Sequence, residues 1–340
     1  MKLEFYAVYF LTFVLSFLLA IYGTPLARQA AIKFGIVDKP DGNLKVQRDP
    51  VPYLGGLAIY LAFLLALSLT FTFSYELLGI MLGGTIIVLL GLIDDFGVLQ
   101  PEVKLIGQII AAFVLIKSGT MIYLTFIPFW LRVFLTGLWI VGVTNAFNII
   151  DVMDGLSSGV AAIAAITLSV VAIGNDKTTV AIMAIALAGS ALGFLRYNYN
   201  PAKIYMGDTG SMFLGFTLAA LSIGNTVGSY TKTNYFGFIA PVLILGVPIF
   251  DTLLVMFFRH RKGISMFHGS NDHFAIRLKR LGWPVRRIVM ASYLAAAMLS
   301  AWALVLIRVS YLPYLYICIG LLAVVVAFIV YMLGRINVEA

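Results

Sequence analysis

The chain has 340 residues, of which 61% are hydrophobic and only 11% are charged, and its formal net charge is +8. A soluble domain is nearer to about half apolar and about a quarter charged. One soluble core could not enclose this much apolar surface, so much of it must face lipid. The composition excludes a soluble protein, and the single cysteine excludes a disulfide framework or a thiolate-rich metal site.

Uncharged runs that can cross a bilayer of roughly 30 Å recur along the chain. The sequence predicts an all-α polytopic membrane protein, residues 1–340 forming one transmembrane domain of about eleven spans. In chain order the runs are Phe5–Tyr22, Gly55–Phe73, Leu77–Ile93, Leu105–Ile116, Phe129–Val143, Val160–Ile173 with its flanks, Thr178–Leu195, Met212–Ile223 with its flanks, Tyr235–Phe258, Ile288–Ile307 and Tyr314–Leu333. The first is interpreted as a permanent span, because Glu4 offsets Lys2 and no cleavage site follows promptly.

The loops between these runs differ in their content of basic residues. One set of alternate loops, with the C-terminal tail, holds 17 of the 23 Lys and Arg residues. By the positive-inside rule this set is cytoplasmic, which predicts an external N-terminus and a cytoplasmic C-terminus. The asymmetry is explained by topology alone or, in addition, by attraction of an anionic lipid or substrate.

Acidic residues gather in short polar breaks on the predicted cytoplasmic side. The first break, Gly91–Gly97, contains the adjacent pair Asp94 and Asp95. Carboxylates near hydrocarbon are costly, and hard oxygen donors suit Mg²⁺ or Mn²⁺. The alternative is an Asp pair that ends a helix in water.

The second break spaces polar residues three apart, which places them on roughly one face if the segment is helical. These residues are Asn145, Asn148, Asp151 and Asp154. A polar stripe at membrane depth must bind something polar. An interhelical hydrogen-bond network is the alternative, and it accounts for the asparagines better than for the two acids.

A third break runs from Arg196 to Ser211, and Gly207 and Gly210 bracket Asp208 immediately before the next apolar run. Backbone N–H groups at a helix start can face an anion there. Asp251 lies inside the ninth run, where an ionisable residue is a functional candidate by default, and Pro248 is expected to kink that helix. The glycines Gly55 and Gly56 can simply allow close helix packing.

The largest predicted cytoplasmic loop, residues 259–287, carries eight Lys or Arg residues and all three histidines. These are His260, His268 and His273, whose spacing matches no common zinc site. The loop is the natural binding segment for an anion. With the acidic breaks, it predicts a cytoplasmic cleft in which carboxylates hold a divalent cation and basic groups neutralise phosphate, a combination suited to phosphoryl transfer between a lipid and a soluble molecule.

Six ordered motifs resemble the polyprenyl-phosphate N-acetylhexosamine-1-phosphate transferases, the glycosyltransferase family 4 enzymes, over nearly the whole chain. They are Pro52–Gly56, Asp94-Asp95, Lys104–Gln108, Asn145–Gly155, Tyr197–Ser211 and the late His/Arg loop. The chain is most similar to the bacterial undecaprenyl-phosphate N-acetylglucosamine-1-phosphate transferases. The phospho-N-acetylmuramoyl-pentapeptide transferases are the alternative within the family, but their triple-histidine loop is absent.

The resemblance implies a role for each matching residue. Asp94 matches the base for the lipid phosphate, Asp95 its neighbour at the diphosphate and a metal site, and Asp208 the Mg²⁺ ligand. Matching positions for substrate binding are Arg48, Lys104, Asn145, Asn148, Asp151, Asp154, Asn198, His273 and Arg277. Two of three loop histidines are missing after His273, and Val98 replaces an acid, so the identity of the sugar stays open.

The resemblance also implies the substrates UDP-N-acetylglucosamine and undecaprenyl phosphate, Mg²⁺ as cofactor, a bacterial inner-membrane location, a homodimer and no nucleic-acid partner. Direct in-line attack is favoured over a two-step route through an aspartyl intermediate. The alternative of another class is a secondary transporter, since membrane-embedded acids and a broken helix also serve ion coupling. The acids gather at one face, however, and no inverted repeat is evident. The roles of Asp251 and His268 and the glycan that is made stay open.

Overall fold

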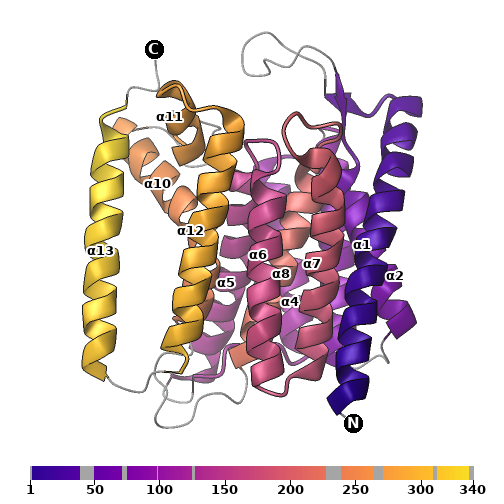
Figure 1. The fold of residues 1–340 in the computed structure, drawn as a ribbon, viewed down its shortest axis with the longest axis horizontal. Coiled ribbons are helices and arrows are strands. Elements are labelled where there is room, and N and C mark those ends of the chain that lie inside the picture. The colour runs from indigo at the N-terminus through magenta and orange to yellow at the C-terminus, as the bar shows by residue number, and fades with distance from the viewer. Residues whose placement is uncertain are drawn as a thin grey trace.

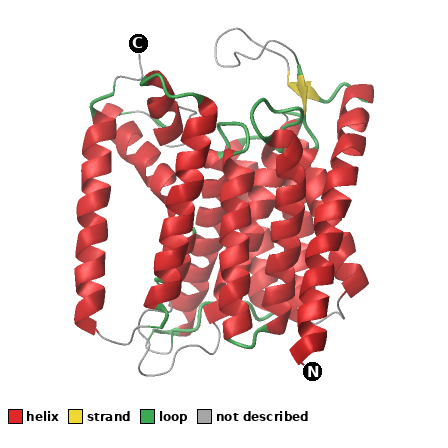
Figure 2. Ribbon diagram, viewed as in Figure 1, coloured by secondary structure: helices red, strands yellow, loops and turns green. Residues whose placement is uncertain are grey.

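The computed structural model describes residues 2–38, 50–70, 75–97, 99–124, 127–226, 239–263, 271–308 and 312–336. These residues form a bundle of helices with a small two-stranded sheet at its upper end (Figures 1 and 2). The helices are α1 (Lys2–Lys33), α2 (Gly55–Thr70), α3 (Tyr75–Asp95), α4 (Pro101–Lys117), α5 (Phe129–Ile150), α6 (Leu156–Gly174), α7 (Thr178–Asn198), α8 (Gly207–Thr226), α9 (Ala240–Ile244), α10 (Gly246–Lys262), α11 (Phe274–Arg280), α12 (Val285–Leu306) and α13 (Leu312–Gly334). The strands β1 (Val37–Asp38) and β2 (Val51–Pro52) pair antiparallel.

The predicted all-α architecture is confirmed, and the described part of each predicted apolar run is mostly helical. Six helices in the described residues are long and apolar enough to cross a membrane, namely α1, α3, α5, α6, α7 and α12. Helix α2 and residues 319–334 of α13 are shorter apolar helices. The chain is therefore a multi-pass membrane protein.

The ninth predicted run is interrupted rather than continuous. Helix α9 ends before Leu245, whose φ of −96° and ψ of 17° depart from helical values, and α10 begins at Gly246. Pro248 lies in the first turn of α10, where a missing N–H costs no hydrogen bond. The expected kink is thus a break placed three residues before the proline, and α10 runs obliquely to α12 (Figure 1).

Helices α6, α7 and α8 form the centre of the bundle and bury long series of Ala, Gly and Ser residues. Small side chains let neighbouring membrane helices approach closely. The outer helices instead expose large apolar side chains, as Phe10 at 71% on α1 and Phe328 at 63% on α13 illustrate. This distribution fits lipid around the bundle and protein packing at its centre.

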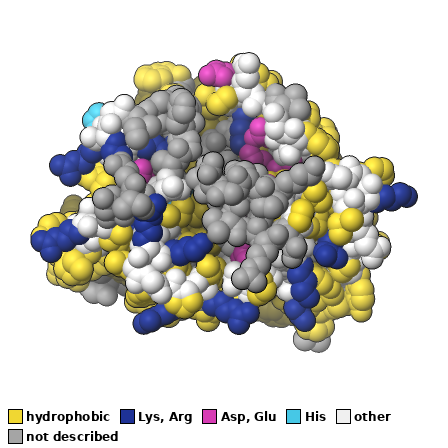
Figure 3. Space-filling view, turned by 90° about the horizontal axis from the view of Figure 1, so that it is seen from above, with side chains coloured by type: hydrophobic (Ala, Val, Ile, Leu, Met, Phe, Trp, Pro, Cys, Tyr) yellow, Lys and Arg dark blue, Asp and Glu magenta, His cyan; other side chains and the backbone are white. Residues whose placement is uncertain are grey.

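The polar breaks of the sequence meet at one end of the bundle, the upper end in Figure 1. The end of α3 and start of α4 lie there, as do the junctions of α5 with α6 and of α7 with α8. Seen from this end, the largest group of acidic side chains lies in the upper right part of the view, and most Lys and Arg side chains lie along the left and lower edges (Figure 3). Helix α1 begins at the opposite end and α13 finishes at this one.

Candidate active site

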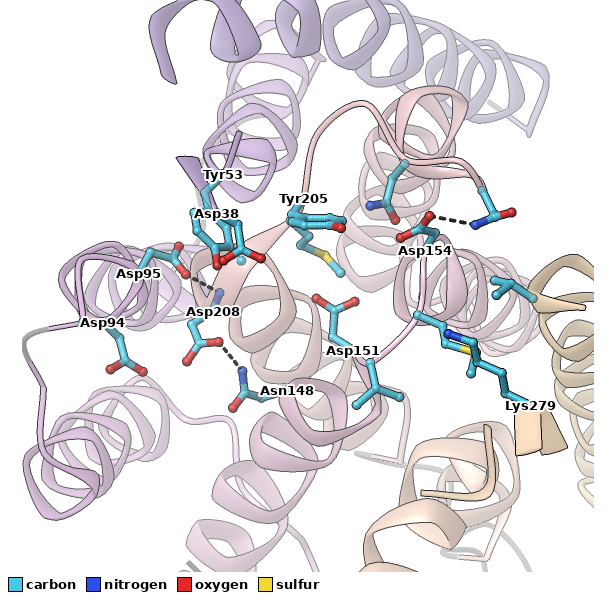
Figure 4. A pocket seen from close by; sticks show the side chains of 18 residues that line it. Asp38, Tyr53, Asp94, Asp95, Asn148, Asp151, Asp154, Tyr205, Asp208 and Lys279 are labelled. Atoms are coloured by element: carbon cyan, nitrogen blue, oxygen red, sulfur yellow. Dashed lines mark hydrogen bonds between the residues drawn. The ribbon is translucent and has the colours of Figure 1, made fainter. Parts of the chain in front are cut away.

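A pocket of about 840 Å³ opens at the upper end of the bundle, beside the small sheet (Figure 4). Six aspartates contribute to its lining, which are Asp38, Asp94, Asp95, Asp151, Asp154 and Asp208. Carboxylates gathered in one cavity repel one another unless cations or hydrogen-bond donors compensate their charge. The partners of each aspartate therefore decide what the pocket can do.

Lys104 lies between two of these aspartates. Its Nζ is 2.6 Å from Asp94 Oδ2 and forms a second ion pair with Asp208. It also donates to Asn148 Oδ1 at 3.2 Å, while Asn148 Nδ2 donates to Asp208 Oδ1 at 2.9 Å. Residues from α3, α4, α5 and α8 are thereby joined in one network. The Lys104 ammonium balances part of the negative charge of Asp94 and Asp208.

Asp95 has a different set of partners from its neighbour. Its Oδ1 accepts a hydrogen bond from the Asp208 N–H at 2.7 Å, and its Oδ2 accepts from the Thr209 N–H at 3.2 Å and from Thr209 Oγ1 at 2.6 Å. These donors belong to the first turn of α8, where backbone N–H groups have no partner within the helix. The anion expected at the glycine-flanked helix start is thus a carboxylate of the protein itself.

Glycines permit this close arrangement of α2 and α8. A Cβ on Gly56 would lie 2.1 Å from the backbone N of Gly210. Gly207 has a φ of +68°, and a Cβ there would lie 2.5 Å from Asp95 Oδ2. The interpretation that Gly56 allows close helix packing is confirmed. This packing of α2 against α8 keeps the start of α8, with Asp208, at the pocket.

Asp151 follows the last residue of α5 and points toward the middle of the pocket (Figure 4). Its carboxylate makes no hydrogen bond or ion pair with any described residue. Burial, followed by the negative charges of Asp208, Asp95 and Asp154, raises the pKa of Asp151 to about 8. With this pKa Asp151 is a neutral carboxyl group near pH 7, and it can exchange hydrogen bonds with a ligand.

Asp154 and Asn198 line the pocket, but their hydrogen bonds hold its wall together. Asp154 Oδ2 accepts from Asn200 Nδ2 at 2.9 Å and from the Ala202 N–H at 3.0 Å. Asn198 Oδ1 accepts from the Gly155 N–H at 2.9 Å, and Asn198 Nδ2 donates to the Ile204 carbonyl at 3.1 Å. Both residues tie the α5–α6 junction to the segment before α8.

A family model described as glycosyl transferase family 4 matches residues 77–225, the segment that contains the whole Lys104 network. A Bacillus subtilis protein named probable undecaprenyl-phosphate N-acetylglucosaminyl 1-phosphate transferase is 36% identical over 303 residues, covering 86% of this chain and 84% of that protein. A Mycobacterium leprae decaprenyl-phosphate N-acetylglucosaminephosphotransferase is 34% identical over 280 residues, or 72% and 70% of the two chains. The chain belongs to glycosyl transferase family 4.

A phospho-N-acetylmuramoyl-pentapeptide-transferase from Bacillus cytotoxicus is also similar, at 34% identity over 239 residues, covering 62% of this chain and 72% of that protein. The match to the N-acetylglucosamine enzymes extends further along the chain. Both branches of glycosyl transferase family 4 that the motifs resemble are therefore represented among its relatives.

Other residues assigned by the resemblance lie outside the pocket lining. Asn145 exchanges hydrogen bonds with Gln108, Nδ2 donating to Gln108 Oε1 at 2.6 Å. His273 Nδ1 lies 2.8 Å from Asp251 Oδ2, and the Phe274 N–H donates to Asp251 Oδ1 at 2.9 Å. Asp251 thus fixes the start of α11. Arg48 and His268 lie outside the described residues, as does Val98.

Arg277 is almost fully buried and holds the end of α13. It donates to the carbonyl oxygens of Leu333 and Ile336, both at 2.9 Å, and pairs with Asp272 at 2.8 Å. Its guanidinium also stacks on Phe258, 3.9 Å from the ring centroid. These contacts give Arg277 a structural task, and the pocket lining does not include it.

Sequence analysis of this glycosyl transferase family 4 chain did not single out Asp38, Tyr53, Tyr205 or Lys279, all of which line the pocket. Burial and a hydrogen bond to Asp38 raise the pKa of Tyr53, and burial raises that of Tyr205 to about 12. Both phenols are therefore neutral near pH 7. A detectable signal for two of them was the short polar segment before the second apolar run, which contains Asp38 and Tyr53.

The groups near Asp208 include residues of the kind that bind a divalent cation. No three acidic, histidine or cysteine side chains in the described parts of the chain are arranged to hold a metal ion. Instead, oxygens of Asp94, Asp208 and Asn148 surround the Lys104 ammonium. Carboxylate and amide oxygens are the ligands that Mg²⁺ prefers, so their chemistry fits a divalent cation. Asp95, the second predicted ligand, already accepts three hydrogen bonds.

Proposed function

We propose that this protein transfers N-acetylglucosamine 1-phosphate, or a related N-acetylhexosamine 1-phosphate, from a UDP-sugar to undecaprenyl phosphate, giving a lipid-diphosphate sugar and UMP. The names of its relatives support undecaprenyl or decaprenyl phosphate as acceptor and N-acetylglucosamine 1-phosphate as the transferred group. In a bacterium this is a first membrane step in the synthesis of a cell-envelope polysaccharide.

One observation carries the proposal: Lys104 pairs with Asp94 and Asp208, two of the aspartates that line a pocket at the ends of membrane helices. Mixed charges at this depth are costly in a membrane protein and mark a polar substrate. The pocket is reached from the water side, where a nucleotide sugar arrives, and its walls are helices that continue into lipid. A lipid phosphate and a soluble diphosphate can meet there.

In the proposed reaction an oxygen of the lipid phosphate attacks the β-phosphorus of the UDP-sugar in line. A new P–O bond forms as the bond between that phosphorus and the UMP oxygen breaks. Asp94, at the pocket end of α3, takes the proton of the lipid phosphate, and Lys104 offsets negative charge on the phosphate oxygens. We favour this direct route over a two-step route through an aspartyl intermediate.

Mg²⁺, or Mn²⁺ in its place, would neutralise charge that develops on the diphosphate. Asp208 is the proposed ligand, and Asp94 and Asn148 would supply further oxygens, since both contact the Lys104 ammonium that pairs with Asp208. Asp95 would contribute by holding the first turn of α8, which carries Asp208. Asp151 would accept hydrogen bonds from the nucleotide sugar, and the half-buried ring of Tyr205 would stack on its base.

We further propose eleven spans in a bacterial inner membrane, with the pocket and the C-terminus in the cytoplasm. The excess of Lys and Arg in the loops at the pocket end supports this orientation. A homodimer is proposed on the family resemblance alone.

The test uses the full-length protein, purified in detergent, with UDP-N-acetylglucosamine, undecaprenyl phosphate and Mg²⁺. We expect UMP and a lipid-linked sugar in equal amounts, and neither product when the lipid or the cation is left out. UDP-N-acetylmuramoyl-pentapeptide, supplied as the competing donor, is expected to give no product. UMP release without lipid, or substrate uptake into vesicles without transfer, would remove the proposal.

A further inference from the structure

The position of Lys104 in the network is that of an ion in a binding site. Three oxygen-bearing side chains, on three other helices, contact its Nζ: Asp94 at 2.6 Å, Asn148 at 3.2 Å and Asp208 in a second ion pair. The Lys104 side chain is only 17% exposed. Lys104, in the first turn of α4, thus places its positive charge among three side-chain oxygens at the end of a flexible four-carbon chain.

The same oxygens are those the proposed function assigns to a divalent cation. No three acidic, His or Cys side chains of the described residues are grouped to hold a metal ion, and the Lys104 ammonium stands among these oxygens. An ammonium and a divalent cation cannot share Asp94 and Asp208 at these distances, since they repel each other strongly where water is scarce. One of the two must leave when the other is bound.

We infer that Lys104 is an internal placeholder cation, which holds Asp94 and Asp208 together in the metal-free protein and withdraws its Nζ when a divalent cation binds. The inference rests on the proposed function and adds a competition inside the site. Without Lys104, the two carboxylates would repel each other while no metal is bound. After withdrawal, the same ammonium is free to turn toward the anionic phosphates in the pocket.

If the Lys104 ammonium competes with the metal ion, removing its charge should strengthen metal binding. In Lys104→Met the stem remains and the charge is lost, so Mn²⁺ should bind about fivefold more tightly than to the wild type. In Lys104→Arg the charge remains on a rigid fork that pairs firmly with carboxylates. Mn²⁺ should therefore bind to this variant no more tightly than to the wild type.

In the experiment Mn²⁺ is titrated into the full-length protein in detergent without substrates, and the concentration of free Mn²⁺ is measured by electron paramagnetic resonance. Lys279→Met is the matched control, since Lys279 lines the same pocket on the side away from Asp94 (Figure 4). It corrects for the general loss of one positive charge, and its affinity should stay within about twofold of the wild type. Asp208→Asn should abolish the binding in either background.

The outcomes test the placeholder role of Lys104 separately from the proposed transferase function. Unchanged or weaker Mn²⁺ binding in Lys104→Met, or equal tightening in Lys279→Met, overturns the placeholder role and leaves the transferase proposal standing. Absence of Mn²⁺ binding in all variants overturns the metal part of the proposed function and the inference with it. If Lys104→Met does not fold, as judged by gel filtration, tighter binding in Lys104→Arg overturns the inference by itself.

Discussion

Asp95, the last residue of α3, caps the first turn of α8 by accepting a 2.6 Å hydrogen bond from Thr209 Oγ1. The two backbone N–H bonds that accompany it make this carboxylate the N-terminal cap of a helix that is distant in sequence. Its neighbour Asp94 pairs with Lys104 instead, so two adjacent carboxylates have different partners.

The cap predicts different stability effects for the two neighbours. Asp95→Ala leaves the α8 donors without their partner and should cost about 1–2 kcal/mol, lowering the melting temperature in detergent. Asp94→Ala is the matched control, because Lys104 keeps its pair with Asp208 and the loss should be below about 1 kcal/mol. Equal losses for the two variants would contradict the assignment of the cap to Asp95.

Asp208→Asn should abolish Mg²⁺-dependent UMP release. The variant loses the charge that pairs with Lys104 and the proposed metal ligand, and we expect a rate loss of about 10²–10³-fold or more. Asp176→Asn, in the turn between α6 and α7 at the opposite end of the bundle, is the control and should keep its activity. Wild-type turnover by Asp208→Asn would exclude Asp208 from the site.

The raised pKa of Asp151 predicts a pH-dependent cost to stability. Its folded-state pKa of about 8 lies above the ordinary value of about 3.9, so the native state holds a proton that the unfolded state releases first. Below about pH 4 both states hold the proton, and Asp151 does not reduce the stability of the native state. As the pH rises from about 4 toward 8, the unfolded state releases its proton and the native state becomes less stable relative to it. In EDTA, Asp151→Asn should therefore raise the melting temperature most at pH 8 and least at pH 5. A difference that is constant across this range would show that Asp151 does not titrate in it.

Because α2 and α8 are in close contact at Gly56, we expect the addition of one methyl group at this position to destabilise the protein. Gly56→Ala would place its Cβ 2.1 Å from the Gly210 backbone N, so the helices must separate at a cost of about 1–3 kcal/mol. Gly142→Ala on α5 is the control, since nothing lies within 4 Å of its added Cβ. Thermal melting of the two variants measures the difference, and an unchanged Gly56→Ala protein would refute the close contact.

Arg277→Met tests whether this residue serves the fold or the substrate. Its contacts to the end of α13 predict lower stability, by about 1–3 kcal/mol, with little change in the KM for the UDP-sugar below the melting temperature. Activity and melting are measured on the same preparation. A large rise in KM with unchanged melting would instead support the role that the family resemblance implies.

Much of this architecture was predictable because lipid imposes long apolar runs on the sequence. The predicted runs coincide with helices, and the clusters around Asp94, Asp151 and Asp208 do meet in one pocket. The individual partners were not predictable. Whether Asp95 or Asp94 faces Lys104, or whether Asn198 binds a ligand or the Gly155 N–H, depends on contacts between helices far apart in the chain.

The ion pair of Asp94 with Lys104 also bears on how the chain enters a membrane. The two residues are ten positions apart, on either side of the short connection between α3 and α4. They can neutralise each other as soon as this helical hairpin forms, before the ribosome has made α8. Charges that would oppose the insertion of single helices are thereby carried in as a pair, and Asp208 joins them only when the later helices arrive.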